Sequence, residues 1–272
     1  MDEIAGVVSN TKLTGGLWQL VVRAPELARS AQPGQFAHIR LSGHGEHVLR
    51  RPLSIHDVYA DRRGDFDYVS FIYQIIGAGT ETLASYRMED SLEVLGPLGR
   101  GWHPPEATGK ALLVGGGVGY VPLMLLAGTL HARGIETLSA IGMRDRDNAL
   151  AFYGASSYRT WDVRDVEGSG RVREAWATDD GSFGHHGLVT ELSAHFLGEE
   201  DFDYVAACGP EPMMRIVAEQ AQAAGVYCEV SLERHMACGI GACLSCIVAT
   251  TEGQKRACAD GPVFSAREVI WQ

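Results

Sequence analysis

Four cysteines near the end of the chain restrict most strongly what this sequence can fold into. Cys238, Cys243 and Cys246 are separated by four and then two residues, and Cys258 follows after eleven more. The stretch 227–272 is too short to build a stable core alone, so something has to hold it together. The spacing is that of plant-type 2Fe–2S sites, in which cysteine thiolates hold two irons.

Two other uses of these cysteines can be weighed against a cluster. Structural zinc sites favour two separated Cys-x2–4-Cys pairs, whereas here three cysteines share one loop. Disulfides are disfavoured by the crowding of the cysteines and by the reducing compartment that we infer below. Gly239 and Gly241 support a cluster, because a residue without a Cβ lets backbone N–H groups turn toward the sulfurs. We therefore predict a 2Fe–2S cluster on these four cysteines, with Cys208 and Cys228 outside it.

Charge and composition exclude several classes of protein. The 272 residues carry 34 acidic and 23 basic side chains, a net charge of −11, so a nucleic-acid partner is not expected. The acidic start, Met1–Glu3, lacks the features of a signal peptide, and six cysteines without such a signal indicate the cytoplasm. Ala111–Leu130 is uncharged and long enough to span a bilayer. Its glycines and Pro122 instead favour a buried strand, a tight turn and a helix, so no membrane span is expected.

Three consecutive domains are predicted: 1–101, 108–226 and 227–272. The first shows short β-type runs between Gly, Pro and Asp turns, which is typical of an all-β barrel or sandwich. We expect its strands at Leu17–Val22, Phe36–Leu41 and Tyr68–Ile75, and a helix at Thr80–Arg87.

Strands and helices alternate in the second domain, which predicts a parallel sheet. Strands are expected at Ala111–Val114, Thr137–Met143, Arg171–Ala177 and Tyr204–Ala207. Helices are expected up to about His131 and at Met213–Ala224. Turn-forming residues Gly99–Pro105 mark the linker to the first domain.

The first domain contains two short motifs that suit a flavin nucleotide. The first motif is Arg51, Pro52, Leu53 and Ser54, in which the arginine offers a forked charge to a pyrophosphate and the serine a hydroxyl to the flavin ring. The second is Gly79 and Thr80 at a predicted helix N-terminus, where free N–H groups attract phosphate. Each motif alone is more often a turn or a helix cap. Together, and ahead of a cluster segment, they predict a flavin site.

Two motifs in the second domain follow buried strands. The first consists of Gly115, Gly116, Gly117 and Gly119, which lie between a strand and a helix, as a dinucleotide pyrophosphate turn requires. The spacing is not Gly-x-Gly-x-x-Gly, and a plain tight turn is the alternative. The second motif consists of Cys208, Gly209 and Pro210, expected at the carboxyl end of the sheet, where ligands bind in such folds. For Cys208, a small buried residue is a serious alternative.

The order of these motifs resembles the ferredoxin reductase superfamily, which joins an FAD-binding barrel to a pyridine-nucleotide domain. Glu233–Cys246 and Cys258–Phe264 are similar to the electron-transfer subunits of type B dihydroorotate dehydrogenase, and the resemblance covers essentially the whole chain. It implies a multidomain α+β fold. The three parts would be an antiparallel FAD-binding β-barrel, an α/β parallel-sheet nucleotide domain and a small 2Fe–2S cluster domain.

The resemblance also implies residue roles. FAD would be held by the four residues from Arg51 to Ser54, by a lining of Ile72, Tyr73 and Gln74, and by phosphate contacts at Gly79 and Thr80. NAD would bind at the glycine turn and at Cys208, Gly209 and Pro210. Gln74 departs from the arginine of many members, which puts one FAD contact in doubt. Arg144 and Arg146 suit a 2′-phosphate but alternate with Asp145 and Asp147, so NAD rather than NADP is taken from the resemblance.

These parts use the whole length, whereas a TIM barrel for dihydroorotate oxidation would need about 250 more residues. The cluster would therefore face another protein. The resemblance implies an oxidoreductase subunit in pyrimidine biosynthesis, relaying electrons from an FMN-containing catalytic subunit through 2Fe–2S and FAD to NAD in a heterotetramer. Alternatives are a subunit of a sulfide dehydrogenase or of a bifurcating ferredoxin:NADP oxidoreductase, and a zinc-binding interaction module without flavin.

Overall fold

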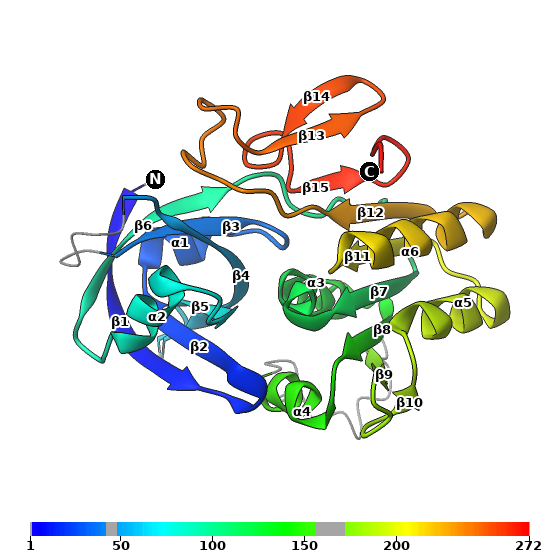
Figure 1. The fold of residues 1–272 in the computed structure, drawn as a ribbon, viewed down its shortest axis with the longest axis horizontal. Coiled ribbons are helices and arrows are strands. Elements are labelled where there is room, and N and C mark those ends of the chain that lie inside the picture. Colours follow the sequence, from blue (N-terminus) through cyan, green and yellow to red (C-terminus); the bar gives the residue numbers. More distant parts are fainter. Residues whose placement is uncertain (1, 42–47, 62, 156–171, 272) are drawn as a thin grey trace.

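Antiparallel strands fold the first hundred residues into a closed six-stranded barrel (Figure 1). The computed structural model describes residues 2–41, 48–61, 63–155 and 172–271. Neighbouring strands follow the order β1-β2-β5-β4-β3-β6. Their bounds are β1 Asp2–Lys12, β2 Leu17–Arg23, β3 Phe36–Arg40, β4 Arg51–Ala60, β5 Phe66–Gln74 and β6 Ser91–Leu98. The predicted all-β domain is therefore a barrel and not a sandwich.

Alternating burial along the strands fills the barrel with apolar side chains. Leu20, Ile39, Ile55 and Phe71 point inward from four different strands and are fully buried. Two helices lie in the connections between the barrel strands: α1 Pro25–Ser30 between β2 and β3, and α2 Ala78–Ser85 between β5 and β6. The predicted strands fall on β2, β3 and β5, and the predicted helix falls on α2, displaced by two residues.

A seven-stranded sheet forms the second core, in the order β10-β9-β8-β7-β11-β12-β15. Every neighbouring pair is parallel except β12 with β15. The strands are β7 Lys110–Gly116, β8 Glu136–Met143, β9 Val172–Thr178, β10 His185–His186, β11 Tyr204–Cys208, β12 Tyr227–Ser231 and β15 Val263–Ser265. The predicted parallel sheet is confirmed. Of its predicted third strand, Arg171 lies outside the described residues.

Helices cover both faces of this sheet (Figure 1). They are α3 Val121–Ala132, α4 Arg146–Ala155, α5 Val189–Glu199 and α6 Glu211–Ala223, with short 3-10 turns η1 Thr14–Gly16 and η2 Gly117–Tyr120. The helix α3 lies between the sheet and the barrel, while α5 and α6 pack on the opposite face. Within the part of the chain that the structure describes, no helix is long and apolar enough to cross a membrane. The uncharged stretch Ala111–Leu130 is instead β7, η2 and most of α3, as expected.

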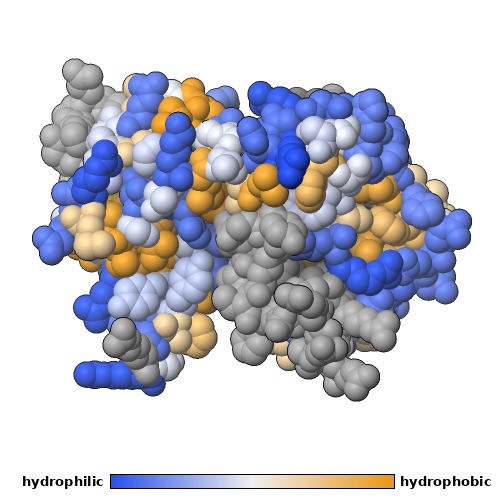
Figure 2. All heavy atoms as spheres, turned by 90° about the horizontal axis from the view of Figure 1, so that it is seen from below, coloured by the Kyte–Doolittle hydropathy of each residue, from blue (hydrophilic) through white to orange (hydrophobic). Residues whose placement is uncertain are grey.

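The outer surface differs from these cores in its mixture of residues. On the face seen from below, hydrophilic residues are interspersed with small apolar patches across the width of the molecule (Figure 2). The large apolar side chains of α3, among them Leu123, Leu126 and Leu130, are buried in the core that it shares with the sheet. The apolar character of this helix therefore follows from its position between two packed layers.

The cysteine-rich stretch is built into the sheet at its base. Its strands β12 and β15 pair with each other, and its only hairpin among the described residues is β13 Ile247–Thr250 with β14 Gly253–Arg256. The Leu232 N–H donates to the Pro262 carbonyl at 2.9 Å, which closes the base of the segment 233–261, called here the cysteine-rich lobe. The predicted boundary at residue 226 therefore does not coincide with an edge of the sheet. Val230 of β12 and Phe264 of β15 are buried because both strands belong to the seven-stranded sheet and share its core.

The linker between barrel and sheet is tied to every part of the molecule. The Trp102 N–H donates to Pro33 O of the barrel at 3.0 Å, and its indole N–H donates to Pro122 O of α3 at 3.0 Å. The Arg100 N–H donates to Gly261 O of the cysteine-rich lobe at 2.5 Å. The linker thus fixes the three parts relative to one another.

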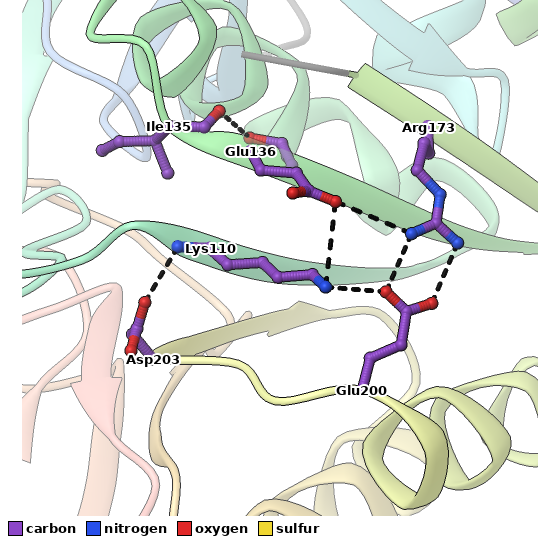
Figure 3. Close-up of polar contacts among 7 residues, drawn as sticks. Lys110, Ile135, Glu136, Arg173, Glu200 and Asp203 are labelled. Carbon is purple, nitrogen blue, oxygen red and sulfur yellow. Dashed lines mark hydrogen bonds and ion pairs between the residues drawn. The ribbon is translucent and has the colours of Figure 1, made fainter.

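An ion network closes the amino-terminal edge of the sheet (Figure 3). Glu200 accepts two bonds from the Arg173 guanidinium at 2.8 and 2.9 Å and one from Lys110 Nζ at 2.7 Å. Glu136 adds weaker pairs with both cations at 3.7 and 3.8 Å. These bonds lower the pKa of Glu200 to about 2, with the hydrogen bond from Arg173 the largest cause. The network joins the strands β7, β8 and β9 to Glu200, the residue after α5, at the strand ends opposite the glycine turn.

We expect Glu200→Gln to destabilise the protein by about 1 kcal/mol at neutral pH, since the network is partly exposed to solvent. The depressed pKa means that the contribution of Glu200 is complete above its ordinary pKa of 4.5 and is lost as the pH falls toward about 2. Urea unfolding of both proteins at pH 7 and pH 3 measures the difference. Glu199→Gln, in the exposed neighbour, is the matched control. A difference that stays constant between pH 7 and pH 3 would contradict this account.

Candidate functional site

Positive backbone angles shape the loop that carries the first three predicted ligands. Gly239, Gly241 and Leu244 have φ values of 73°, 81° and 59°, a region that favours residues without a Cβ. The Gly241 N–H consequently points at the Cys258 Sγ, 3.1 Å away. The Cys243 N–H points at the Cys238 Sγ at 3.4 Å. The prediction that glycines turn N–H groups toward the sulfurs agrees with these contacts.

The four thiols lie in two pairs. Cys238 Sγ accepts from the Cys243 N–H on the outer side, and Cys246 is a close neighbour of Cys258 on the buried side. Hydrogen bonds from Ser245 lower the pKa of Cys243 to about 6, whereas burial, followed by the neighbouring Cys246, raises the pKa of Cys258 to about 12. Among the described residues, no group of three His, Cys, Asp or Glu side chains is placed to hold a single metal ion. Two pairs of sulfurs suit a centre with two irons and a pair of cysteines on each.

Arg256, which the sequence analysis did not select, holds the loop in place. Its guanidinium donates to both carboxylate oxygens of Asp260 at 2.8 and 3.0 Å and to Gly241 O at 3.2 Å. The same guanidinium holds the pKa of Asp260 at about 2, and its positive charge lies near Cys246 and Cys258. The position of Arg256, two residues before the last cysteine, was the feature of the sequence that could have identified it. The site therefore has a cation that offsets thiolate charge.

The two motifs predicted for flavin meet in space. The Arg51 guanidinium lies directly against Gly79 in the first turn of α2, where a Cβ would be 2.0 Å from Arg51 Nε. Thr80 Oγ1 accepts from the N–H groups of Ile76 and Gly77 at 2.9 and 3.3 Å and shapes the turn that enters the helix. A forked cation next to a helix N-terminus is a suitable binding place for a pyrophosphate. The absence of a Cβ at Gly79 is what makes this approach possible.

The other residues predicted to bind flavin differ in whether their side chains can reach a ligand. Pro52 and Ser54 lie on the outer face of β4, opposite His38 and Phe36 of β3, whereas Leu53 points into the barrel core. Ile72 and Tyr73 of β5 are buried. The Tyr73 hydroxyl donates to Asn10 at 3.0 Å and its ring stacks on Trp18, so only its backbone can face a ligand. The side chain of Gln74 is exposed.

The two nucleotide motifs also come together, because β7 and β11 are neighbours in the sheet. A Cβ at Gly119 would lie 2.5 Å from Gly209 Cα, and a Cβ at Gly116 would lie 3.0 Å from Pro210 Cδ. Gly117 has a φ of 57°, and a Cβ at this residue would meet no atom within 4 Å, so its backbone is open. The turn lies at the carboxyl ends of parallel strands, the usual place for ligands in α/β folds.

Cys208 and Asp145 have structural contacts of their own. Cys208 Sγ is buried and donates to Ser231 O at 3.6 Å, and burial raises the pKa of the thiol to about 12. Cys208 is therefore an inert packing residue whose backbone alone can face a nucleotide. Asp145 precedes α4 and accepts from Asn148 N at 2.9 Å, which caps that helix. This carboxylate is occupied and does not decide between NAD and NADP.

A buried carboxylate, Glu229 of β12, was not anticipated. It accepts a hydrogen bond from the Tyr204 hydroxyl at 2.6 Å and one from the His103 backbone N–H at 2.8 Å. Burial and this carboxylate raise the pKa of Tyr204 well above its ordinary value. The Tyr227 hydroxyl, two residues away, adds only a longer bond of 3.4 Å, and the two shorter bonds come from residues at least 25 positions away, so the local sequence does not mark Glu229 as buried.

Comparison with known proteins adds the family. Residues 233–270 match the iron-sulfur cluster binding domain of dihydroorotate dehydrogenase B. The chain is 36% identical to the dihydroorotate dehydrogenase B (NAD(+)) electron transfer subunit of Desulforamulus reducens, covering 92% of this chain and 90% of the relative. It is 37% identical to the subunit of the same name from Bacillus caldolyticus, covering 97% and 96%.

Solved structures agree on the fold. An NADH-dependent reduced ferredoxin-NADP oxidoreductase, described for flavin-based electron bifurcation, superposes with a TM-score of 0.83 at 29% identity over 99% of this chain and 90% of that one. The Amycolatopsis cytochrome P450 reductase GcoB superposes with a TM-score of 0.63 at 19% identity, over 82% of this chain and 66% of that one. The second likeness shows the fold alone.

Proposed function

The chain belongs to the family of electron transfer subunits of dihydroorotate dehydrogenase B (NAD(+)), and from this membership we propose that it connects a dihydroorotate-oxidising partner with NAD⁺. The observation that carries the proposal is the arrangement of four thiols in two pairs beside a flavin-type barrel and a nucleotide-type sheet. When bound, FAD supplies the conversion between a two-electron hydride and single electrons.

Each group has its own residues in this proposal. Cys238, Cys243, Cys246 and Cys258 hold the 2Fe–2S cluster, with N–H groups of the loop directed at their sulfurs. FAD lies on the outer face of β4, where Arg51 and the first turn of α2 hold its pyrophosphate; the residues assigned to it are Arg51, Pro52, Leu53, Ser54, Ile72, Tyr73, Gln74, Gly79 and Thr80. NAD binds at the carboxyl edge of the sheet; its residues are Gly115, Gly116, Gly117, Gly119, Cys208, Gly209 and Pro210.

The parts 1–101, 108–226 and 227–272 are then the flavin-binding, nucleotide-binding and cluster-binding domains, and β12 and β15 of the last part complete the sheet.

We place the partner at the cluster loop. Ile240 and Leu244 are 62% and 60% exposed there and flank the exposed Cys243, so apolar contact and a metal ligand share one surface. The partner is an FMN-containing catalytic subunit and the assembly a heterotetramer, which rests on the family. The cytoplasmic location rests on the six cysteines, none of which forms a disulfide.

A second function is favoured by one specific observation. The bifurcating ferredoxin-NADP oxidoreductase superposes over 99% of this chain. A partner that is a large second flavoprotein, rather than an FMN enzyme for dihydroorotate, would support that function.

The test is to produce the chain with a dihydroorotate-oxidising FMN subunit and to purify the complex. We expect flavin and iron–sulfur absorption, a rhombic EPR signal after reduction, and NAD⁺ reduction that depends on dihydroorotate. The same chain purified alone should retain both chromophores and reduce artificial dyes with NADH. A colourless chain that contains zinc would contradict the proposal and support an interaction module.

A further inference from the structure

His38 is a buried histidine that lacks the partners its ring requires. It lies in β3 with 0% of its surface exposed. Within residues 2–41, 48–61, 63–155 and 172–271, neither Nδ1 nor Nε2 has a hydrogen-bond partner. Burying a polar group without a hydrogen bond costs on the order of 1–3 kcal/mol. Most buried polar groups have a partner in the protein or in ordered water, so a ring without one calls for an explanation, such as a bound water, ion or cofactor.

The cluster loop covers this ring. A Cβ at Gly239 would lie 2.7 Å from His38 Nδ1 and 2.8 Å from Cε1, so the Nδ1 edge of the ring faces the loop at the residue after Cys238. The Phe36 ring, 5.7 Å from the imidazole centre, packs beside it on the same outer face of the barrel. Only a glycine at position 239 leaves room for this contact.

The flavin motif lies on the same face. His38 is the direct partner of Pro52 in the β3–β4 pair, and Phe36 is the partner of Ser54. Directly opposed residues of an antiparallel pair present their side chains on one side of the sheet. His38 therefore stands between the strand assigned to the flavin and the loop assigned to the cluster.

We propose that His38 donates a hydrogen bond from a ring N–H to a sulfur of the 2Fe–2S cluster. An imidazole carries at least one N–H in either protonation state, so the donor is always present. Hydrogen bonds to cluster sulfurs help to set the reduction potential. A donor stabilises the reduced, more negative cluster more than the oxidised one, so it raises the potential. The inference rests on the proposed function, because it needs a cluster on the four cysteines.

The test compares His38→Leu with His38→Asn, whose amide N–H falls near the position of Nδ1. The cluster potential is measured by EPR-monitored redox titration of the complex. For His38→Leu we expect about a tenfold lower ratio of reduced to oxidised cluster at a fixed potential, or about 59 mV for one electron. His38→Asn should recover most of this shift. His56→Leu, at another fully buried barrel histidine that contacts Ser70 at 2.8 Å, should leave the potential unchanged.

Other outcomes overturn the inference. An unchanged potential in His38→Leu contradicts it, and so does an equal shift in His56→Leu, which indicates a general effect of barrel damage. If His38→Leu does not fold, pulsed EPR of wild-type protein labelled with ¹⁵N-histidine decides. A nitrogen coupling that His38→Asn abolishes supports the bond, and an unaffected spectrum overturns it. A wild-type protein without any cluster would instead refute the proposed function.

Discussion

Replacing Cys258 by serine is expected to remove the iron–sulfur EPR signal and to lower dihydroorotate-dependent NAD⁺ reduction by more than about 100-fold, since even changes to residues around metal ligands cost 10–100-fold. Cys258 is buried, pairs with Cys246 and receives the Gly241 N–H at 3.1 Å. A serine hydroxyl at this position is a far weaker ligand than a thiolate. Reduction of a dye by NADH should remain, because the flavin and nucleotide motifs lie elsewhere.

The control for this variant is Cys228→Ala. Cys228 is also buried and belongs to the same C-terminal stretch, but it lies in β12, outside the ligand spacing. It should keep full iron content, measured by chemical analysis, with only a modest loss of stability. A full cluster in Cys258→Ser, or an equal loss of iron in Cys228→Ala, would refute the ligand assignment.

Gly119→Ala is expected to raise the KM for NADH about 100-fold while both chromophores stay in place. The new Cβ would lie 2.5 Å from Gly209 Cα, so backbone rather than a flexible side chain has to move. The displacement separates the two nucleotide motifs, and a misplacement of about 1 Å can cost about 100-fold. Steady-state reduction of a dye by NADH measures the effect, and visible spectra verify the flavin content.

Gly128→Ala is the matched control, because Gly128 lies in α3 with nothing within 4 Å of a Cβ. Alanine is the better helix former, so this variant should be as stable as the wild type or more so. Equal kinetics for Gly119→Ala and Gly128→Ala would show that nucleotide binding does not depend on the close contact of the two motifs.

Local patterns were sufficient to select the four cysteines that the structure brings together and to predict four strands of the seven-stranded sheet. The spacing from Cys238 to Cys258 is itself typical of a single cysteine-carrying loop followed by one more distant cysteine. The apolar run at Ala111–Val114 indicates a buried segment, which is the strand β7. The helices α4 and α5 were not predicted, because polar residues interrupt their apolar faces. The strand β15 has three residues, and its pairing with β12 depends on a distant part of the chain.

Contacts between distant residues explain what sequence reasoning missed in the site. His38 and Gly239 are about two hundred residues apart in sequence, and no periodicity connects them. Glu229 is similar, because its burial depends on Tyr204 and on the linker at His103. The inward orientation of Leu53 and Tyr73 followed from strand register, which the motif itself does not reveal.

The way in which the lobe between Leu232 and Pro262 joins the sheet determines where this fold can accommodate variation. Its two ends meet through a hydrogen bond of 2.9 Å and continue into paired strands, β12 and β15. In topological terms the cysteine-rich lobe is an insertion between two paired strands at one side of the sheet. Because both ends of this segment are held at one place, its length and sequence can change without changing the register of any strand of the sheet.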